Sequence, residues 1–185
     1  MNKTIDQYRS IQQICKSIFV QKAQDYGTSW RVLRPSSVTD QLLIKAFRIR
    51  SIEEQKDQQI DELPDVEYVG LVNYSIMALI QTDLGSTDKD LSLEQTSDLY
   101  DKYFDQAFEL MLKKNHDYGE IWRQMRMSSF TDLILSKILR IRRMEENDGK
   151  TLISEGVSSN YLDIINYAVF ALIIWSESKT WSFKF

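Results

Sequence analysis

The sequence contains one long segment twice. Residues 22–54 align without a gap on residues 114–146, and 18 of these 33 pairs are identical at an offset of 92. After one inserted residue, the match resumes between residues 68–81 and 161–174 at an offset of 93. Unrelated segments would share only about one position in fifteen to twenty, so the chain is an internal duplication. Positions that both copies keep are therefore candidates for a shared role.

Each copy is predicted to be helical. The chain has only six glycines and two prolines, its apolar residues recur at helical spacing, and no run alternates as a half-exposed strand does. Three helices are expected in each copy, at residues 6–24, 39–58 and 65–81 and at residues 97–116, 131–147 and 159–176. Since neither copy buries its apolar faces well alone, we predict an all-α fold of two fused three-helix repeats. The first repeat (1–92) and the second repeat (93–185) should form one compact bundle with approximate twofold symmetry.

Local signals mark the ends of some helices. Asp-Tyr-Gly at residues 25–27 and 117–119 is predicted to end the first helix of each repeat, because glycine readily takes the left-handed conformation there. Thr39 and Thr131, or the serines just before them, are candidate N-caps of the middle helices. The polar residues 82–93 are the expected connector between the repeats.

Composition narrows the class of partner. A formal charge of −4 over 185 residues gives no net basic field, which disfavours duplex nucleic acid. Cys15 is the only cysteine, and its apolar neighbours predict a core thiol in a reduced, cytoplasmic protein. The N-terminus lacks the apolar run of a signal peptide. The longest apolar stretch, residues 161–175, contains Asp163 and is predicted to be a buried helix, so no membrane contact is expected.

The middle helices place charged residues among apolar ones. The lysines lie inside the apolar stripe, the arginines border it and the glutamates point inward, at positions kept in both repeats: Lys45, Arg48, Glu53, and Lys137, Arg140, Glu145. A charge that faces a core is costly unless it is paired or solvated. These residues therefore predict a polar ligand cleft between the helices. The alternative is a buried ion pair, or a lysine that extends to the rim.

The closing helices add a second group of polar residues. Asn73 and Asn166 lie in otherwise apolar surroundings and need partners inside the fold. Asp163 shares a face with Asn166, whereas Gly70 takes its place in the first repeat. The carboxylates of the second repeat are candidates for a magnesium site: Glu145, Glu155 and Asp163. The alternative for Asp163 is a helix-capping or ion-pair residue.

Both repeats also share an Asp-Tyr-Gly-x-x-Trp element. Its aromatic residues either staple the first helix to the middle helix or stack on a base: Tyr26, Trp30, Tyr118 and Trp122. In the second interpretation the following Arg31 or Arg123 contacts a phosphate. The chain has one histidine, no zinc-binding spacing, no phosphate-binding glycine loop and no dinucleotide fingerprint, so those enzyme classes are set aside.

Taken together, the shared motifs resemble a known family. The pattern K-x-x-D-Y-G-x-x-W, S-x-x-T-D, K-x-x-R-I-R-x-x-E-E and N-Y-x-x-x-A-L is similar, once per repeat, to the nucleotide modification associated domain 1 family. A more distant similarity is to the MazG-like all-α NTP pyrophosphatases, which the following residues match in outline: Lys137, Arg140, Glu155, Asp163 and Tyr167. The chain departs from that family in the spacing of its carboxylates, because eight positions separate Glu155 from Asp163.

The resemblance implies a function and roles for the candidate residues. Magnesium held by Glu145, Glu155 and Asp163 would activate water against a phosphoanhydride of a nucleotide or modified nucleotide, while the catalytic Lys137 and Arg140 would neutralise developing charge. The substrate-binding candidates are Lys45, Arg48, Tyr26, Trp30, Tyr118, Trp122, Asn73 and Asn166. The alternative is a non-catalytic helical module that binds a nucleotide or a protein partner. Aromatic residues in the tail indicate a contact surface for a homodimer: Trp175, Trp181, Phe183 and Phe185.

Overall fold

The computed structural model describes residues 2–54, 64–147 and 156–178, and these residues contain helices and no strand. The all-α prediction is confirmed. In chain order the elements are α1 (Asn2–Tyr26), the 3-10 helix η1 (Ser29–Val32), α2 (Pro35–Glu54), α3 (Pro64–Leu84), α4 (Leu93–Tyr118), the 3-10 helix η2 (Ile121–Gln124), α5 (Met127–Glu146) and α6 (Val157–Ser178).

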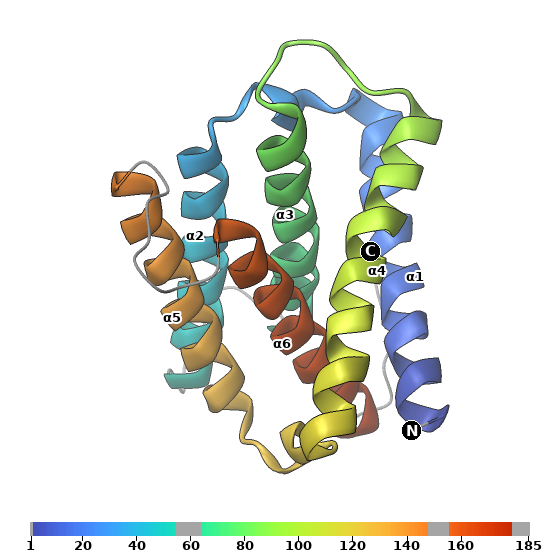
Figure 1. Cartoon of the computed structure of the whole chain (residues 1–185), viewed down its shortest axis with the longest axis vertical. Coiled ribbons are helices and arrows are strands. Elements are labelled where there is room, and N and C mark those ends of the chain that lie inside the picture. The colour runs from blue at the N-terminus through green and yellow to red at the C-terminus, as the bar shows by residue number, and fades with distance from the viewer. Residues whose placement is uncertain (1, 55–63, 148–155, 179–185) are drawn as a thin grey trace.

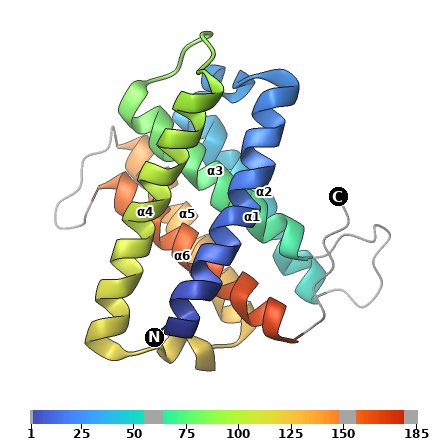
Figure 2. The same ribbon diagram turned by 90° about the vertical axis from the view of Figure 1, so that its right-hand side faces the viewer.

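Each helix of the first repeat packs against its counterpart in the second. The pairs are α1 with α4, α2 with α5 and α3 with α6. They form three layers, with α3 and α6 in the middle, α2 and α5 on one side, and α1 and α4 on the other (Figures 1 and 2). This arrangement confirms the predicted pseudo-twofold bundle, in which the two repeats share one core.

The middle layer supplies most of the core. Helices α3 and α6 are apolar on nearly every face, as expected of helices covered on all sides. Among the described residues, α6 alone is long and apolar enough to cross a membrane by length and composition. It packs against α1, α3, α4 and α5, and Ile164, Ala168 and Leu172 are fully buried. These contacts agree with the predicted buried helix.

The helix ends follow the sequence signals in part. Gly27 and Gly119 have φ values of 68° and 71°, and their amides bond to the carbonyls of Ala23 and Asn115 at 3.0 and 2.9 Å. The predicted glycine ends are therefore confirmed. The N-cap prediction was wrong, because α2 begins at Pro35 and α5 at Met127, which places Thr39 and Thr131 in the second turn. Proline suits the first position of a helix, where its missing N–H is not needed.

The two threonines instead join the repeats. Two equivalent triads cross the pseudo-twofold axis: Thr39 with Glu145 and Tyr161, and Thr131 with Glu53 and Tyr68. In each triad the threonine hydroxyl donates to the glutamate, at 2.7 and 2.8 Å, and lies 3.2 and 3.0 Å from the tyrosine hydroxyl. Burial raises the pKa of both glutamates and outweighs the lowering by the threonine bond. The inward glutamates thus contact the other repeat.

Two asparagines make a second symmetric set of bonds between the repeats. Each amide nitrogen donates to a backbone carbonyl of its own repeat, and each amide oxygen accepts from a tyrosine of the other. The bonds are Asn73 to Cys15 at 3.1 Å, Tyr100 to Asn73 at 3.1 Å, Asn166 to Ala107 at 3.0 Å and Tyr8 to Asn166 at 2.6 Å. Both amides are satisfied inside the core, as the sequence required.

We expect Asn166→Ala to lower the free energy of unfolding by about 2 kcal/mol, because it leaves the buried Tyr8 hydroxyl without its partner and removes the side-chain bond to the Ala107 carbonyl. Urea unfolding followed by circular dichroism measures the loss. The exposed Gln24→Ala on α1 is the control and should change stability by less than about 0.5 kcal/mol. Equal losses in the two variants would contradict the assigned role of the amide.

Candidate ligand-binding site

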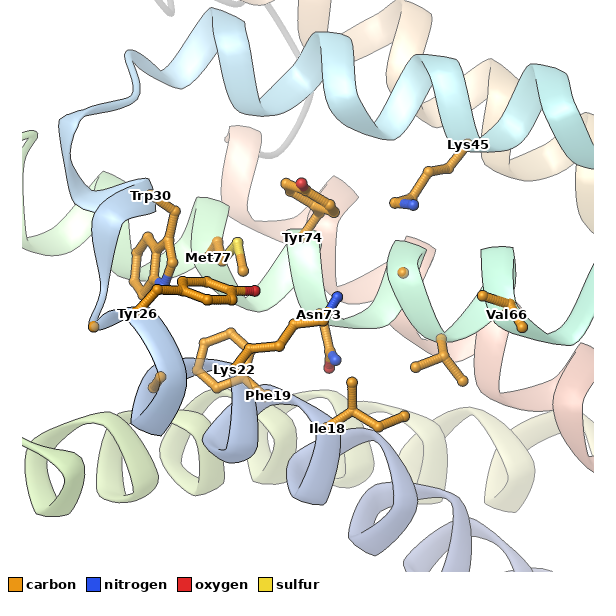
Figure 3. Close-up of a pocket in the computed structure, with 14 residues that line it drawn as sticks. Ile18, Phe19, Lys22, Tyr26, Trp30, Lys45, Val66, Asn73, Tyr74 and Met77 are labelled. Atoms are coloured by element: carbon orange, nitrogen blue, oxygen red, sulfur yellow. The ribbon is translucent and has the colours of Figure 1, made fainter. Parts of the chain in front are cut away.

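A pocket of about 250 Å³ lies in the first repeat, where α1 and the turn after it meet α2 and α3. Its walls are mostly apolar and aromatic. The aromatic residues are Phe19, Tyr26, Trp30 and Tyr74, and the cationic residues are Lys22 and Lys45. Figure 3 shows Lys22 of α1 and Lys45 of α2 extending toward the pocket from opposite walls, with Tyr26 and Tyr74 beside them. Such a lining suits a flat ligand with an anionic group.

Gly70 makes room for one of these lysines. It lies in α3, and a Cβ atom at this position would be only 2.6 Å from Cδ and Cε of Lys45. The missing side chain therefore lets the lysine stem cross the face of α3. The ammonium group of Lys45 then lies 5.6 Å from the ring centroid of Tyr74, within the range of a cation–π contact.

The positive charge around this pocket is only partly paired. Glu67 of α3 is 2% exposed, and its carboxylate lies 3.2 Å from both Lys45 and Arg48. Lys22 is exposed and makes no ion pair with any residue that the structure describes. Lys22 therefore brings to the pocket a positive charge that no described carboxylate pairs, and this charge favours an anionic ligand.

In the matching region of the second repeat, a carboxylate joins the two equivalent lysines in an ion-pair cluster. Asp163 stands at the position of Gly70, and its two carboxylate oxygens accept from Lys114 at 2.6 Å and from Lys137 at 2.7 Å. These lysines are the counterparts of Lys22 and Lys45. Burial raises the pKa of Asp163, but the bonds to the two lysines lower it by more. The net pKa is therefore below its usual value. The carboxylate is ionised and held inside its own repeat.

An aromatic stack in the second repeat is a further difference between the two repeats. Phe170 of α6 replaces Met77 of the first repeat, and its ring stacks on Trp122 with centroids 4.2 Å apart and planes 5° apart. Trp122 is 4% exposed. Met77 lines the first-repeat pocket, whereas the larger Phe170 ring packs on the tryptophan of the second repeat, so the two repeats share a fold but differ in this wall.

The structure gathers the first-repeat candidates at the pocket. Lys45, Tyr26, Trp30 and Asn73 line it directly, whereas Arg48 pairs with Glu67 and does not line it. The amide of Asn73 is fully engaged in its bonds between the repeats, so its role here is structural.

The second-repeat candidates are placed elsewhere. Lys137 is paired with Asp163, Trp122 is stacked, Asn166 bridges the repeats, and Tyr118 is 60% exposed. Arg140 lines an open surface groove that also contains Arg50, Asp132 and Arg143. The described residues of this repeat therefore do not bring together the catalytic pair that the sequence suggested.

The arginines that follow the tryptophans bond to the protein. Arg31 is 4% exposed and donates to Gln81, whose amide nitrogen donates to the Arg31 carbonyl at 2.9 Å. Arg123 donates to Thr4 at 2.7 Å and to Gln7 at 2.8 Å. These bonds favour the interpretation of this element as a staple between helices, and the burial of Arg31 keeps its side chain from the proposed phosphate contact.

The predicted magnesium ligands differ in their surroundings. Glu155 lies outside the described residues, as do Trp181, Phe183 and Phe185 of the predicted contact surface. Glu145 accepts from Thr39, and Asp163 accepts from two lysines. Within residues 2–54, 64–147 and 156–178, no group of three His, Cys, Asp or Glu residues could hold a metal ion. A carboxylate that is already neutralised by two ammonium groups is a poor ligand for a further cation.

Sequence reasoning missed three residues of the pocket region. Lys22 is the first residue of its matched segment, and Lys114 is the first residue of the other. This recurrence was the available signal. Glu67 aligns with Asn160, so its role could not be found by searching for shared charges. Gly70 was seen as the loss of an acidic residue, although its effect is to create space.

The fold and pocket define a duplicated all-α protein in which one repeat offers an open, positively charged ligand site. A family model for nucleotide modification associated domain 1 matches the chain twice, over residues 22–82 and 114–174. These matches cover more than half of the chain, so the protein belongs to this family as a tandem duplication. No curated protein and no solved structure matches the chain, and a relationship to the MazG-like enzymes is not shown.

We expect Asp163→Asn to lower the free energy of unfolding by about 2 kcal/mol at pH 7, because the two lysines lose their shared counter-charge. Since the folded-state pKa of Asp163 is lowered, its stabilisation is present above the unfolded pKa, near 4, and is lost as the pH falls through the folded value. Urea unfolding between pH 2.5 and 8 measures the free energy of unfolding of the wild-type protein and of Asp163→Asn. The two values should converge at the acidic end, below the pKa of ~3.9 of a free aspartate.

The matched control is Asp105→Asn, whose carboxylate pairs with Arg9 at the surface and is 50% exposed. This change should cost less than about 1 kcal/mol at neutral pH. A cost for Asp163→Asn that is no larger, or that does not depend on pH, would contradict the ion-pair cluster.

Proposed function

We propose that this protein is a nucleotide-binding module and that its ligand site is the pocket of the first repeat. The observation that carries the proposal is the combination of aromatic walls with two lysines in one open pocket. Membership of a family associated with nucleotide modification supports the choice of a nucleotide over other flat anions. In this proposal the second repeat is structural, because it completes the shared core.

The aromatic side of the pocket suits a nucleobase. Tyr26 is 57% exposed at the mouth, whereas Trp30 and Tyr74 lie deeper. A base stacked on these rings would bury apolar surface without demanding a particular sequence of hydrogen bonds. A volume of about 250 Å³ favours one nucleoside unit over a dinucleotide.

The cationic side suits the phosphate of the same ligand. Lys22 lies on an exposed face of α1 and lines the pocket, and Lys45 is directed along Gly70. Lysine is a compact point charge that binds phosphate without fixed geometry. The two ammonium groups would therefore bind the phosphate, while the nucleobase stacks on the aromatic wall.

Binding without turnover is favoured over hydrolysis by the chemistry of the lining. None of the lining residues in the described part of the chain is an aspartate, a glutamate or a histidine. The lining thus supplies no side chain suited to hold Mg²⁺ or to accept a proton from water. Magnesium-dependent pyrophosphohydrolysis remains the rival proposal, and one assay can separate the two.

We expect at least one nucleoside mono-, di- or triphosphate in a panel to raise the melting temperature. For that ligand, Tyr26→Ala should weaken binding about tenfold, because stacking on an aromatic ring contributes roughly 1–3 kcal/mol per base. Isothermal titration calorimetry measures the affinity. Release of pyrophosphate or phosphate with Mg²⁺ present is followed in the same samples and should be absent.

The control is Tyr118→Ala, at the equivalent and similarly exposed tyrosine of the second repeat, which should leave the affinity unchanged. A panel that gives no stabilisation, or an equal effect of the two alanine variants, would reject the first-repeat pocket as the nucleotide site. Turnover that requires Mg²⁺ would favour the enzyme.

A further inference from the structure

We propose that the pocket contains an anion subsite between Lys22 and Lys45, at the place that the Asp163 carboxylate fills in the second repeat. The inference deepens the proposed function, because the subsite would hold the terminal phosphate of the nucleotide. The subsite itself follows from comparing the repeats and does not depend on which base the ligand carries.

The second repeat shows what the two lysines bind when an anion is present. Lys114 of α4 and Lys137 of α5 come from different helices, and each donates to a different oxygen of the same carboxylate. The carboxylate lies on α6, is 13% exposed and connects all three helices of its repeat. The cluster is therefore a protein-bound example of an anion held by this pair of lysines.

The first repeat keeps both lysines and lacks the carboxylate. Lys22 and Lys45 occupy the equivalent positions on α1 and α2, and both line the open pocket. Gly70 stands where Asp163 would be, so no side chain of α3 enters the space from that position. The missing group is an anion, and the open pocket gives a ligand access to its place.

In each repeat, one carboxylate of the closing helix pairs with the lysine of the middle helix, but the two carboxylates lie at positions one turn apart. In the first repeat it is Glu67, whose counterpart in the second is Asn160. Glu67 pairs with Lys45 and Arg48 and makes no ion pair with Lys22. The shift by one turn thus preserves a counter-charge for the middle helix while it leaves the ammonium group of Lys22 for a ligand.

The experiment introduces the missing carboxylate as Gly70→Asp and compares it with Gly70→Asn. Both variants add a Cβ that displaces the Lys45 side chain, so this steric cost cancels in the comparison. The second repeat shows that a lysine and an aspartate coexist at these positions. Only the aspartate supplies a charge for the two lysines.

We expect Gly70→Asp to melt about 3 °C above Gly70→Asn at pH 7, and the difference should vanish as the pH falls below about 4. Adding Lys22→Gln, at an exposed side chain, should remove most of the difference. Binding of the nucleotide found in the panel should fall at least about tenfold in Gly70→Asp, because the carboxylate takes the phosphate position.

Equal melting temperatures of the two variants at pH 7, or a difference that survives Lys22→Gln, would overturn the anion subsite. If both variants unfold, Lys22→Gln alone decides, since it should weaken binding of inorganic phosphate at least fivefold, and unchanged binding would overturn the subsite. A charge-dependent gain in Gly70→Asp with no nucleotide response in the wild-type protein would sustain the subsite and reject the proposed function.

Discussion

The fold depends on hydrogen bonds that each repeat makes to the other. Asn73 and Asn166, in the two middle-layer helices, accept from tyrosines of the opposite repeat, and Thr39 and Thr131 donate to glutamates across the same axis. A buried amide without partners is costly, so neither repeat can separate without losing these bonds together with its apolar contacts. The repeats therefore form one folding unit, although each matches the family model separately.

This symmetric core leaves the positions near the pocket free to differ. A change from Gly70 to Asp163 alters no bond between the repeats, because both positions face the lysines of their own repeat. Similarly, Met77 and Phe170 differ in size next to the two tryptophans. One repeat could thus retain an open pocket while the other was filled, at no cost to the interactions that define the fold.

The sequence predicted the features that have a local signal and missed contacts between distant residues and features of one copy alone. Helix positions, glycine ends and the buried amide of Asn166 follow from spacing and burial, which are local or are duplicated. The partner of Glu145 lies 106 positions away, and no local pattern indicates it. The chemistry was assigned to the second repeat because Asp163 is present there, yet that carboxylate fills the space between its lysines. The absence of a side chain at Gly70 was the more informative signal.

A fused duplication separates two demands that a homodimer must meet in both subunits. An open pocket next to unpaired lysine charge sacrifices packing and ion pairing, whereas the closed cluster around Asp163 gains both. In a homodimer every copy would carry the less stable arrangement. Here the second repeat supplies the stable arrangement and the first supplies access, so an anionic ligand would give the first repeat the charge pairing that the second has permanently. Ligand binding and stability are then linked through the same two lysines, by mass action on the folded state.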